Sequence, residues 1–180
     1  MKENSAIIIV DMINDYAHSN GDDYCENSEM IKDNIYLLKD YANKNNIPLF
    51  YANTSVSSPI SPVALKWGLS AFEQSWGSCL IDELKDLKEN EFIIKKESYD
   101  AFYNTNLNKI LKMMNINNIY IAGVHSHVCV LLTAASAFNY GYEVCLIEDA
   151  TTTNKKEKHD FAVNYVNSLL GHTKKIYQIL

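Results

Sequence analysis

The sequence predicts an α/β protein, a three-layer α/β/α, Rossmann-like domain built on a mostly parallel sheet of six strands. Short runs rich in β-branched residues alternate with longer stretches whose apolar residues recur at helical spacing. The opening run, Ala6–Val10, is wholly apolar, as expected of a strand buried on both faces of a parallel sheet. No linker, repeat or low-complexity tract interrupts the 180 residues, so we expect a single domain spanning residues 1–180.

Each expected strand is a short apolar or β-branched run bounded by polar residues. The first run stops at Asp11, and the second follows the segment NKNN, which is typical of a helix end. Crossover helices between consecutive strands would make the strands parallel. The six expected strands are Ala6–Val10, Pro48–Ala52, Glu91–Lys95, Asn118–Val124, Glu143–Ile147 and Lys174–Ile179.

The expected helices lie between these strands. Met30–Asn43 is the first, because Ile31, Ile35, Leu38 and Ala42 recur at helical spacing. Glycines end the last two helices, as they often do at helix C-termini. The other expected helices are Cys79–Leu87, Leu107–Asn115, Val128–Asn139 and Lys155–Leu170.

Residues 53–78 show little periodicity, and their two prolines lie near the start, in SSPISP. At about twenty-five residues this segment is too long for a plain connection within a compact domain. We therefore expect it to form a lid or a substrate-binding loop.

The composition excludes several classes of protein. The net charge is −6, all sixteen basic residues are lysines, and no basic block could follow a phosphate backbone, so we expect no nucleic-acid partner. No apolar run is long enough to span a bilayer or to form a signal-peptide core, so we expect no membrane partner. The four cysteines are widely spaced without a CxxC pair, which favours a cytoplasmic protein with reduced thiols.

Reactive side chains follow three of the expected strands. Asp11 follows the first, Lys96 the third, and the segment from His125 to Cys129 the fourth. In parallel sheets, ligands bind beyond the carboxyl ends of the strands, so we expect these groups to meet. A thiol in the first turn of a helix lies near the positive end of the helix dipole, which favours the thiolate of Cys129.

Structural roles compete with each of these assignments. Asp11 is equally interpreted as a helix N-cap, Lys96 as a surface residue and Cys129 as a core residue. His125 and His127 form an H-x-H pair, but no third ligand cluster accompanies them, so we expect no metal. The remaining thiols are expected only to pack in the core; they are Cys25, Cys79 and Cys145.

Three segments together carry a family resemblance. IIIVDMINDY (7–16) resembles the V-D-M-Q-N-D-F signature of the isochorismatase-like cysteine hydrolases, a superfamily that includes the nicotinamidases. IIKKESYDAF (93–102) is similar to the family's K-x-x-Y-S-A-F segment, with Lys96 in the lysine position. AGVHSHVCVLLTAASAFNYGYEVCLIEDA (122–150) resembles the block that contains the family's cysteine. The likeness runs in the right order over nearly the whole chain.

This resemblance implies a catalytic triad of Asp11, Lys96 and Cys129. Asp11 would accept the thiol proton, Lys96 would stabilise the charges, and the thiolate would attack a carbonyl to form a thioester. The resemblance also implies a cis peptide bond between Val124 and His125, so that the backbone N–H groups of His125 and Cys129 form the oxyanion hole. It further implies a homo-oligomer, a dimer or a tetramer, and no cofactor.

Departures from the family pattern indicate the type of reaction. The nicotinamidase D-x-H metal motif would fall in YANTSVSS (51–58), which holds neither Asp nor His, so nicotinamidase activity is not expected. Isochorismatases usually have Gly where Cys129 stands, so a cysteine there favours hydrolysis of a C–N bond in a small amide, ureido or carbamoyl compound. The absence of Arg favours a neutral substrate. We expect the substrate pocket to be lined by Tyr16, Trp67, Trp76 and His127.

Two other functions are compatible with the same pattern. An isochorismatase-type vinyl-ether hydrolase would use Asp11 as an acid and leave Cys129 without a role. A non-catalytic small-molecule binding protein would retain the fold without turnover. The presence of all three triad residues argues against the second of these.

Overall fold

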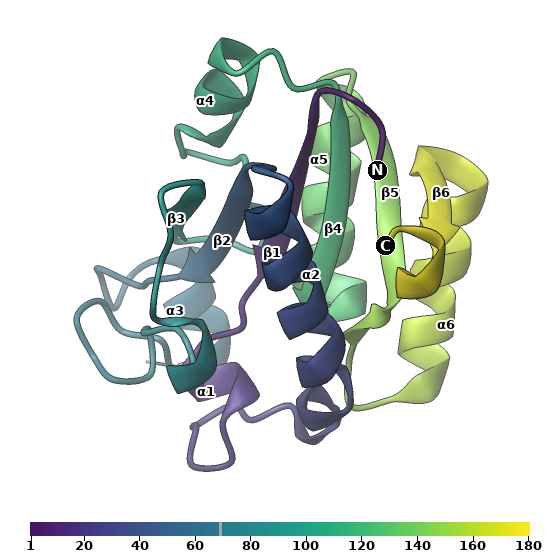
Figure 1. The fold of residues 1–180 in the computed structure, drawn as a ribbon. Helices are drawn as coiled ribbons and strands as arrows, with labels where there is room; N and C mark the ends of the chain where they lie inside the picture. The colour runs from purple at the N-terminus through teal and green to yellow at the C-terminus, as the bar shows by residue number, and fades with distance from the viewer. Residues whose placement is uncertain (69) are drawn as a thin grey trace.

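The computed structural model describes residues 1–68 and 70–180. Its six strands form one sheet in the order β3-β2-β1-β4-β5-β6, and every neighbouring pair is parallel (Figure 1). The predicted α/β/α class with its six-stranded parallel sheet is therefore confirmed. The strands are β1 (Ser5–Val10), β2 (Leu49–Thr54), β3 (Glu91–Lys96), β4 (Asn118–Val124), β5 (Glu143–Thr152) and β6 (Gly171–Lys174).

Helices cover both faces of this sheet, with α2 in front of it and α5 behind it in Figure 1. Within residues 1–68 and 70–180, no helix has the length and apolar character needed to cross a membrane. The α-helices are α1 (Asn14–Ala17), α2 (Lys32–Lys44), α3 (Pro62–Trp67), α4 (Leu107–Met113), α5 (Leu131–Asn139) and α6 (Lys156–Tyr165). Short 3-10 or π segments lie at Glu26–Ile31, Asp82–Leu84, Ser126–Val130, Val166–Leu170 and Ile176–Gln178.

The apolar character of β1 follows from its position at the centre of the sheet. Ile7 and Ile9 pack in the core on the α2 side, whereas Ile8 and Val10 pack in the core on the α5 side. Because side chains of a strand alternate between its two faces, only a strand covered on both sides needs an unbroken apolar run.

The last strand lies earlier in the chain than predicted. β6 spans Gly171–Lys174, and Ile176–Gln178 is a 3-10 turn, so the prediction of a strand at Lys174–Ile179 was wrong beyond Lys174. Ile176 and Ile179 belong to the same core cluster. Residues three apart share a face in a 3-10 turn but point to opposite faces in a strand, so the burial of both isoleucines favours the turn.

The helix predicted at Cys79–Leu87 is also wrong, apart from the single 3-10 turn Asp82–Leu84. The segment instead pairs with the chain that follows β1. Asn14 N–H donates to the Cys79 carbonyl at 2.9 Å, and Ile81 N–H donates to the Met12 carbonyl at 3.2 Å. These bonds satisfy backbone groups that a helix would have paired internally.

The segment 53–78 contains a helix that we did not predict. Ser61 caps α3 by accepting a hydrogen bond from Ala64 N–H at 3.2 Å, and Pro62 occupies the first turn. Both are ordinary helix-start signals and were visible in the sequence as SP. Leu69, within the same predicted loop, lies outside the described residues.

Gly123 in β4 permits the close contact between β4 and β1. Its φ is +111°, and a Cβ atom there would lie 2.1 Å from the carbonyl oxygen of Val10. We expect Gly123→Ala to lower the free energy of unfolding by more than about 2 kcal/mol in denaturant titrations, because neither backbone can move away within the sheet. Gly141 is the matched control, since its φ is +85° but a Cβ atom would meet nothing within 4 Å. Equal losses for Gly123→Ala and Gly141→Ala would contradict the packing argument.

Candidate active site

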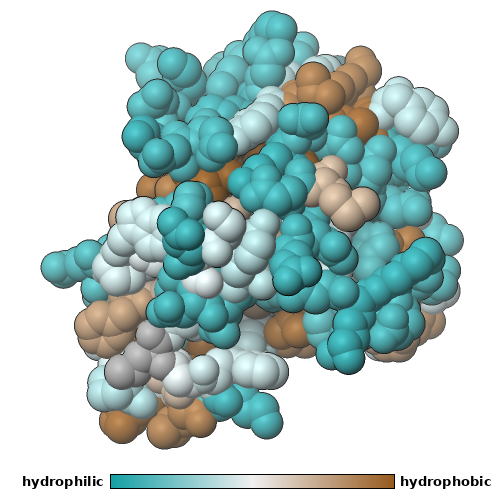
Figure 2. All heavy atoms as spheres, turned by 90° about the horizontal axis from the view of Figure 1, so that it is seen from below, coloured by the Kyte–Doolittle hydropathy of each residue, from teal (hydrophilic) through white to brown (hydrophobic). Residues whose placement is uncertain are grey.

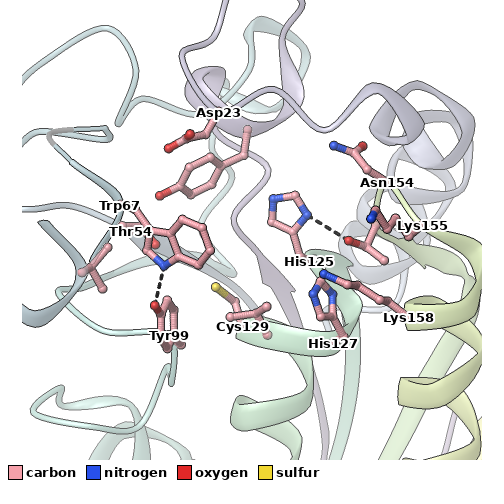
Figure 3. A pocket seen from close by; sticks show the side chains of 14 residues that line it. Asp23, Thr54, Trp67, Tyr99, His125, His127, Cys129, Asn154, Lys155 and Lys158 are labelled. Atoms are coloured by element: carbon pink, nitrogen blue, oxygen red, sulfur yellow. Dashed lines mark hydrogen bonds between the residues drawn. The ribbon is translucent and has the colours of Figure 1, made fainter. Parts of the chain in front are cut away.

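The carboxyl ends of the strands meet at the lower edge of the molecule in Figure 1, beside α1 and α3. Figure 2 views this edge from below: hydrophilic side chains cover most of it, and apolar ones gather at the lower left, on the side of α3. A cavity of about 300 Å³ opens here. It is lined by Tyr16, Asp23, Thr54, Val63, Trp67, Tyr99, His125, His127, Val128, Cys129, Thr153, Asn154, Lys155 and Lys158 (Figure 3).

A buried ion pair lies beneath the cavity. Lys96 Nζ donates to Asp11 Oδ2 at 2.8 Å, and both side chains are fully shielded from solvent. Thr54 completes the arrangement, because its backbone N–H and its hydroxyl donate to Asp11 Oδ1 at 2.7 and 2.9 Å. Register explains the meeting: Thr54 pairs with Lys96 at the ends of β2 and β3, and Asp11 directly follows β1.

The Lys96 ammonium has an acceptor for each of its three protons. Besides Asp11, it donates to Thr54 Oγ1 at 2.8 Å and to the Ser98 carbonyl at 3.1 Å. Burial alone would lower the pKa of Lys96, but Asp11 and Cys129 together outweigh burial and raise that pKa. Lys96 is therefore a permanent positive charge.

Cys129 lies in the π-helical turn Ser126–Val130 that connects β4 to α5. The thiol is buried at the cavity wall, close enough to Asp11 and Lys96 for both to affect its pKa. The peptide bond between Val124 and His125 is cis, as predicted, and the backbone N–H of His125 faces the Cys129 sulfur. The three groups predicted at separate strand ends are thus brought together.

The protonation state of Cys129 differs from the expected one. Burial raises the pKa of the Cys129 thiol, and the opposing effect of Lys96 does not cancel this. The expectation that the helix dipole would favour a thiolate was therefore wrong for the free protein. The structure holds a neutral thiol next to a carboxylate that already receives three hydrogen bonds.

Tyr16 and His125 form one wall of the cavity. The Tyr16 side chain is buried, and burial together with Asp11 raises its pKa, so the phenol remains neutral. Its ring lies 6.1 Å from the His125 ring, and His125 Nδ1 is 3.2 Å from Thr153 Oγ1. Burial lowers the pKa of His125, so the imidazole is neutral near neutral pH.

The two tryptophans lie in different places. Trp67 comes from α3, lines the cavity as predicted, and donates its indole N–H to the Tyr99 hydroxyl (Figure 3). Trp76 is not among the described residues that line the cavity. Trp76 is half exposed, and its ring packs edge-on against His18, with 5.1 Å between the ring centroids. Asn14 Nδ2 donates a hydrogen bond to the Trp76 carbonyl at 2.8 Å and fixes the backbone there.

Asp15 supports the loops beside the cavity and does not enter it. Asp15 Oδ2 accepts a hydrogen bond from Ala71 N–H at 2.6 Å, and a Cβ atom at Gly77 would lie 2.0 Å from that oxygen. Asn14 and Asp15 of the first motif therefore fix the segment around residues 71–77, while Asp11 of the same motif lies under the cavity.

Sequence reasoning missed several residues of the site. Thr54 ends β2, and the segment TTTNKKEK follows the body of β5, so the rule that found Asp11 would also have pointed to these strand ends. Asp23 follows α1 and carried no signal in the sequence. The missed lining residues are Asp23, Thr54, Val63, Tyr99, Val128, Thr153, Asn154, Lys155 and Lys158.

The other thiols divide into two kinds. Cys25 and Cys145 are buried in the core, which confirms the packing role predicted for them. Cys79 is exposed, so the same prediction was wrong for it. Its segment hydrogen-bonds to the chain after β1 at the protein surface, and its sulfur lies 3.4 Å from the Ser75 carbonyl oxygen.

The donor set does not suit a metal ion. Across residues 1–68 and 70–180, no cluster of three or more His, Cys, Asp or Glu side chains is arranged to hold one. At the end of β2, where a metal motif would stand, Thr54 instead binds Asp11 and Lys96. The residues present at this strand end therefore do not fit a metal site.

Comparison with known proteins identifies the family. Residues 5–174 match the Isochorismatase domain. This chain belongs to the isochorismatase family. It is therefore a hydrolase, and the family predicted from the three sequence motifs is confirmed.

Similar proteins cover nearly the whole chain. YaaI of Bacillus subtilis, an uncharacterized isochorismatase family protein, is 28% identical over 94% of this chain and 92% of its own length. An isochorismatase-like hydrolase from Alkaliphilus metalliredigens matches with a TM-score of 0.91 at 25% identity, over 97% of this chain and 96% of that one. N-carbamoylsarcosine amidase from Thermoplasma acidophilum matches with a TM-score of 0.87 at 25% identity, over 98% of this chain and 97% of that one.

Proposed function

We propose that this isochorismatase-family protein is a metal-independent cysteine hydrolase that cleaves the C–N bond of a small amide, ureido or carbamoyl compound. The observation that carries the proposal is the placement of the Cys129 thiol, at the cavity wall, beside the buried Asp11–Lys96 pair. This combines a nucleophile, a proton acceptor and a fixed positive charge. The likeness to an N-carbamoylsarcosine amidase supports the same substrate chemistry.

In the first half-reaction Asp11 removes the proton of the Cys129 thiol as the sulfur attacks the carbonyl carbon. Lys96 stabilises the carboxylate before transfer and the developing thiolate during it. The carbonyl oxygen becomes an oxyanion, which the backbone N–H groups of His125 and Cys129 would stabilise. When the C–N bond breaks, Asp11 returns its proton to the departing ammonia or amine, leaving a thioester or thiocarbamate on Cys129.

In the second half-reaction a water molecule replaces the leaving group. Asp11 accepts a proton from this water, hydroxide attacks the acyl carbon, and the sulfur departs and recovers the proton. The neutral thiol of the free protein suits this cycle, because the same carboxylate can serve as base in each half. Thr54 donates two hydrogen bonds to Asp11 Oδ1, whereas Oδ2 accepts one, from Lys96, so we assign the proton exchange to Oδ2.

Vinyl-ether hydrolysis is the second candidate reaction. It would need Asp11 as an acid and no nucleophile, so a buried thiol beside the acid would have no function. Membership of a hydrolase family argues against a non-catalytic binding protein.

An ammonia-release screen tests the proposal. Amides, ureides and carbamoyl compounds are each incubated with the native protein and with Cys129→Ala. We expect at least one compound to release ammonia only with the native protein. Release from none of them would contradict the proposal.

The raised pKa of Cys129 predicts how the free protein reacts with an alkylating reagent. We expect iodoacetamide to label Cys79 before Cys129 near neutral pH, and Cys129 labelling to accelerate up to at least about pH 9. Labelling accelerates with pH because only the thiolate reacts, and a raised pKa keeps the thiolate fraction of Cys129 small until the pH approaches that pKa. Peptide mass spectrometry at several pH values measures both rates. A Cys129 rate that is already maximal near neutral pH would contradict the assignment of a neutral thiol.

Three further expectations remain part of this proposal. A single domain is supported by one sheet that contains all six strands. A cytoplasmic location is supported by four free cysteines. A homo-oligomer, dimer or tetramer, is supported by apolar side chains exposed on α5 and α6, and light scattering would measure its size; these side chains are Leu132, Phe138, Phe161 and Tyr165.

A further inference from the structure

The cavity has two sides of opposite charge. Figure 3 shows Asp23 on one side and Asn154, Lys155 and Lys158 on the other, with the His125 and His127 rings on the lysine side. The lysines come from the N-terminal end of α6 and the residue before it. A ligand in the cavity would therefore lie between the thiol and a cationic wall.

The positive charges of this wall are not neutralised by the protein. Among the described residues, neither Lys155 nor Lys158 forms an ion pair or a side-chain hydrogen bond, whereas Lys156 between them pairs with Asp160. The charge of Lys96 is already balanced by Asp11. Asp23 is the one carboxylate among the described lining residues, so the lining has a positive excess in a protein of net charge −6.

His127 offers a hydrogen-bonding group beside Lys158. Its Nδ1 is buried and has no partner among the described residues. Burial and, to a smaller extent, the charge of Lys158 lower the pKa of His127, so this imidazole stays neutral. Lys158 also acts to lower the pKa of His125. A neutral imidazole can donate one hydrogen bond without adding charge. Lys158 thus supplies an ammonium group and His127 an imidazole N–H donor on the same wall of the cavity.

We propose that the substrate carries a carboxylate, which Lys158, His127 and Lys155 bind while Cys129 attacks its amide or ureido carbonyl. This inference rests on the proposed function and names its substrate class: amide acids and ureido acids. It replaces the neutral substrate that the absence of Arg had favoured. Lysine binds a carboxylate as a point charge and does not need the two-pronged geometry of Arg.

Binding to Cys129→Ala protein tests the inference without requiring turnover. Each probe acid is compared by calorimetry with a neutral isostere in which an isopropyl group replaces the carboxylate group. N-carbamoylglycine is paired with isobutylurea, and succinamate with 4-methylpentanamide. We expect at least one acid to bind about tenfold more tightly than its isostere, because a hydrogen bond to a charged group contributes about 1.5 kcal/mol or more.

Substitution of single lysines then locates the effect. We expect Lys158→Met to remove most of the preference for the acid and to leave binding of the neutral isostere unchanged. Lys156→Met is the matched control, because Lys156 also lies on α6 and also loses one positive charge, yet it pairs with Asp160 and does not line the cavity. Its preference for the acid should stay within about twofold of the parent protein.

The outcomes separate the two proposals. Equal binding of acid and isostere, binding of neither acid, or equal losses in Lys158→Met and Lys156→Met would each overturn the carboxylate site. Selective acid binding that depends on Lys158, together with no ammonia release by the native protein from any compound, would uphold the carboxylate site and contradict the hydrolytic reaction. In an active protein, Lys158→Met should raise KM for the acid more than it lowers kcat.

Discussion

Asp11→Asn is expected to abolish hydrolysis and to destabilise the protein in a pH-dependent way. The amide cannot accept the thiol proton, so we expect turnover to fall by at least about a thousandfold. The variant also leaves the Lys96 ammonium buried without its counter-charge. Breaking a buried ion pair on one side costs about 3 kcal/mol or more, which denaturant titration near neutral pH would measure.

The pH dependence distinguishes this explanation from a general packing defect. In the native protein the pKa of Lys96 is raised, so its stabilising contribution is complete below its unfolded pKa and is lost as pH rises through the folded one. Without Asp11, the lowering effect of burial loses its main opposing charge, so the pKa of Lys96 falls. The loss of folding free energy caused by Asp11→Asn then becomes smaller as the pH rises and Lys96 loses its proton. We therefore expect the stability difference to shrink toward alkaline pH, and a constant difference would contradict the role of the charge.

Cys129→Ala is expected to eliminate C–N hydrolysis while preserving the fold. Removal of a nucleophile lowers kcat by at least about 10⁴-fold, because the covalent route is lost. The cost in stability should stay below about 2 kcal/mol, since only one sulfur atom leaves a buried site. Ammonia release and thermal unfolding measure the two effects.

Cys145→Ala provides the matched control for this variant. Cys145 is another buried thiol, but it packs in the core on β5, and the cavity does not contact it. We expect a similar loss of stability and unchanged turnover. Activity lost to the same degree in both variants would show that the Cys129 effect is structural.

The sequence was sufficient for the parts of the fold that depend on a repeating pattern. The apolar run of β1 and the spacing of Ile35 and Leu38 in α2 reflect burial that any sheet covered by helices requires. The incorrect elements were short. Ile176 and Ile179 suited either a strand or a 3-10 turn, and only the neighbouring core decides between them. Likewise, the bonds of the Cys79 segment to Met12 and Asn14 are long-range and leave no local pattern.

The candidate site was predictable where a residue lies at the end of a strand or within a few residues after it. Asp11, Lys96 and Cys129 were found in this way, and the structure places them together. The position of Trp76 depends on a hydrogen bond from Asn14, which no spacing reveals. The raised pKa of Cys129 depends on burial, which outweighs the opposing charge of Lys96 and which no sequence pattern reveals. Lys158 was overlooked because a lysine near a helix N-terminus ordinarily faces solvent.

The proposed mechanism requires a covalent bond between Cys129 and the substrate. Its most direct test is the intact mass of the protein, quenched in acid within the first turnovers of a compound that releases ammonia, followed by peptide mapping. We predict an added acyl or carbamoyl mass on the peptide that contains Cys129, its disappearance once the compound is consumed, and no adduct on Cys129→Ala. An unmodified native protein at every time point, with Cys129→Ala releasing ammonia at the native rate, would contradict covalent catalysis by Cys129.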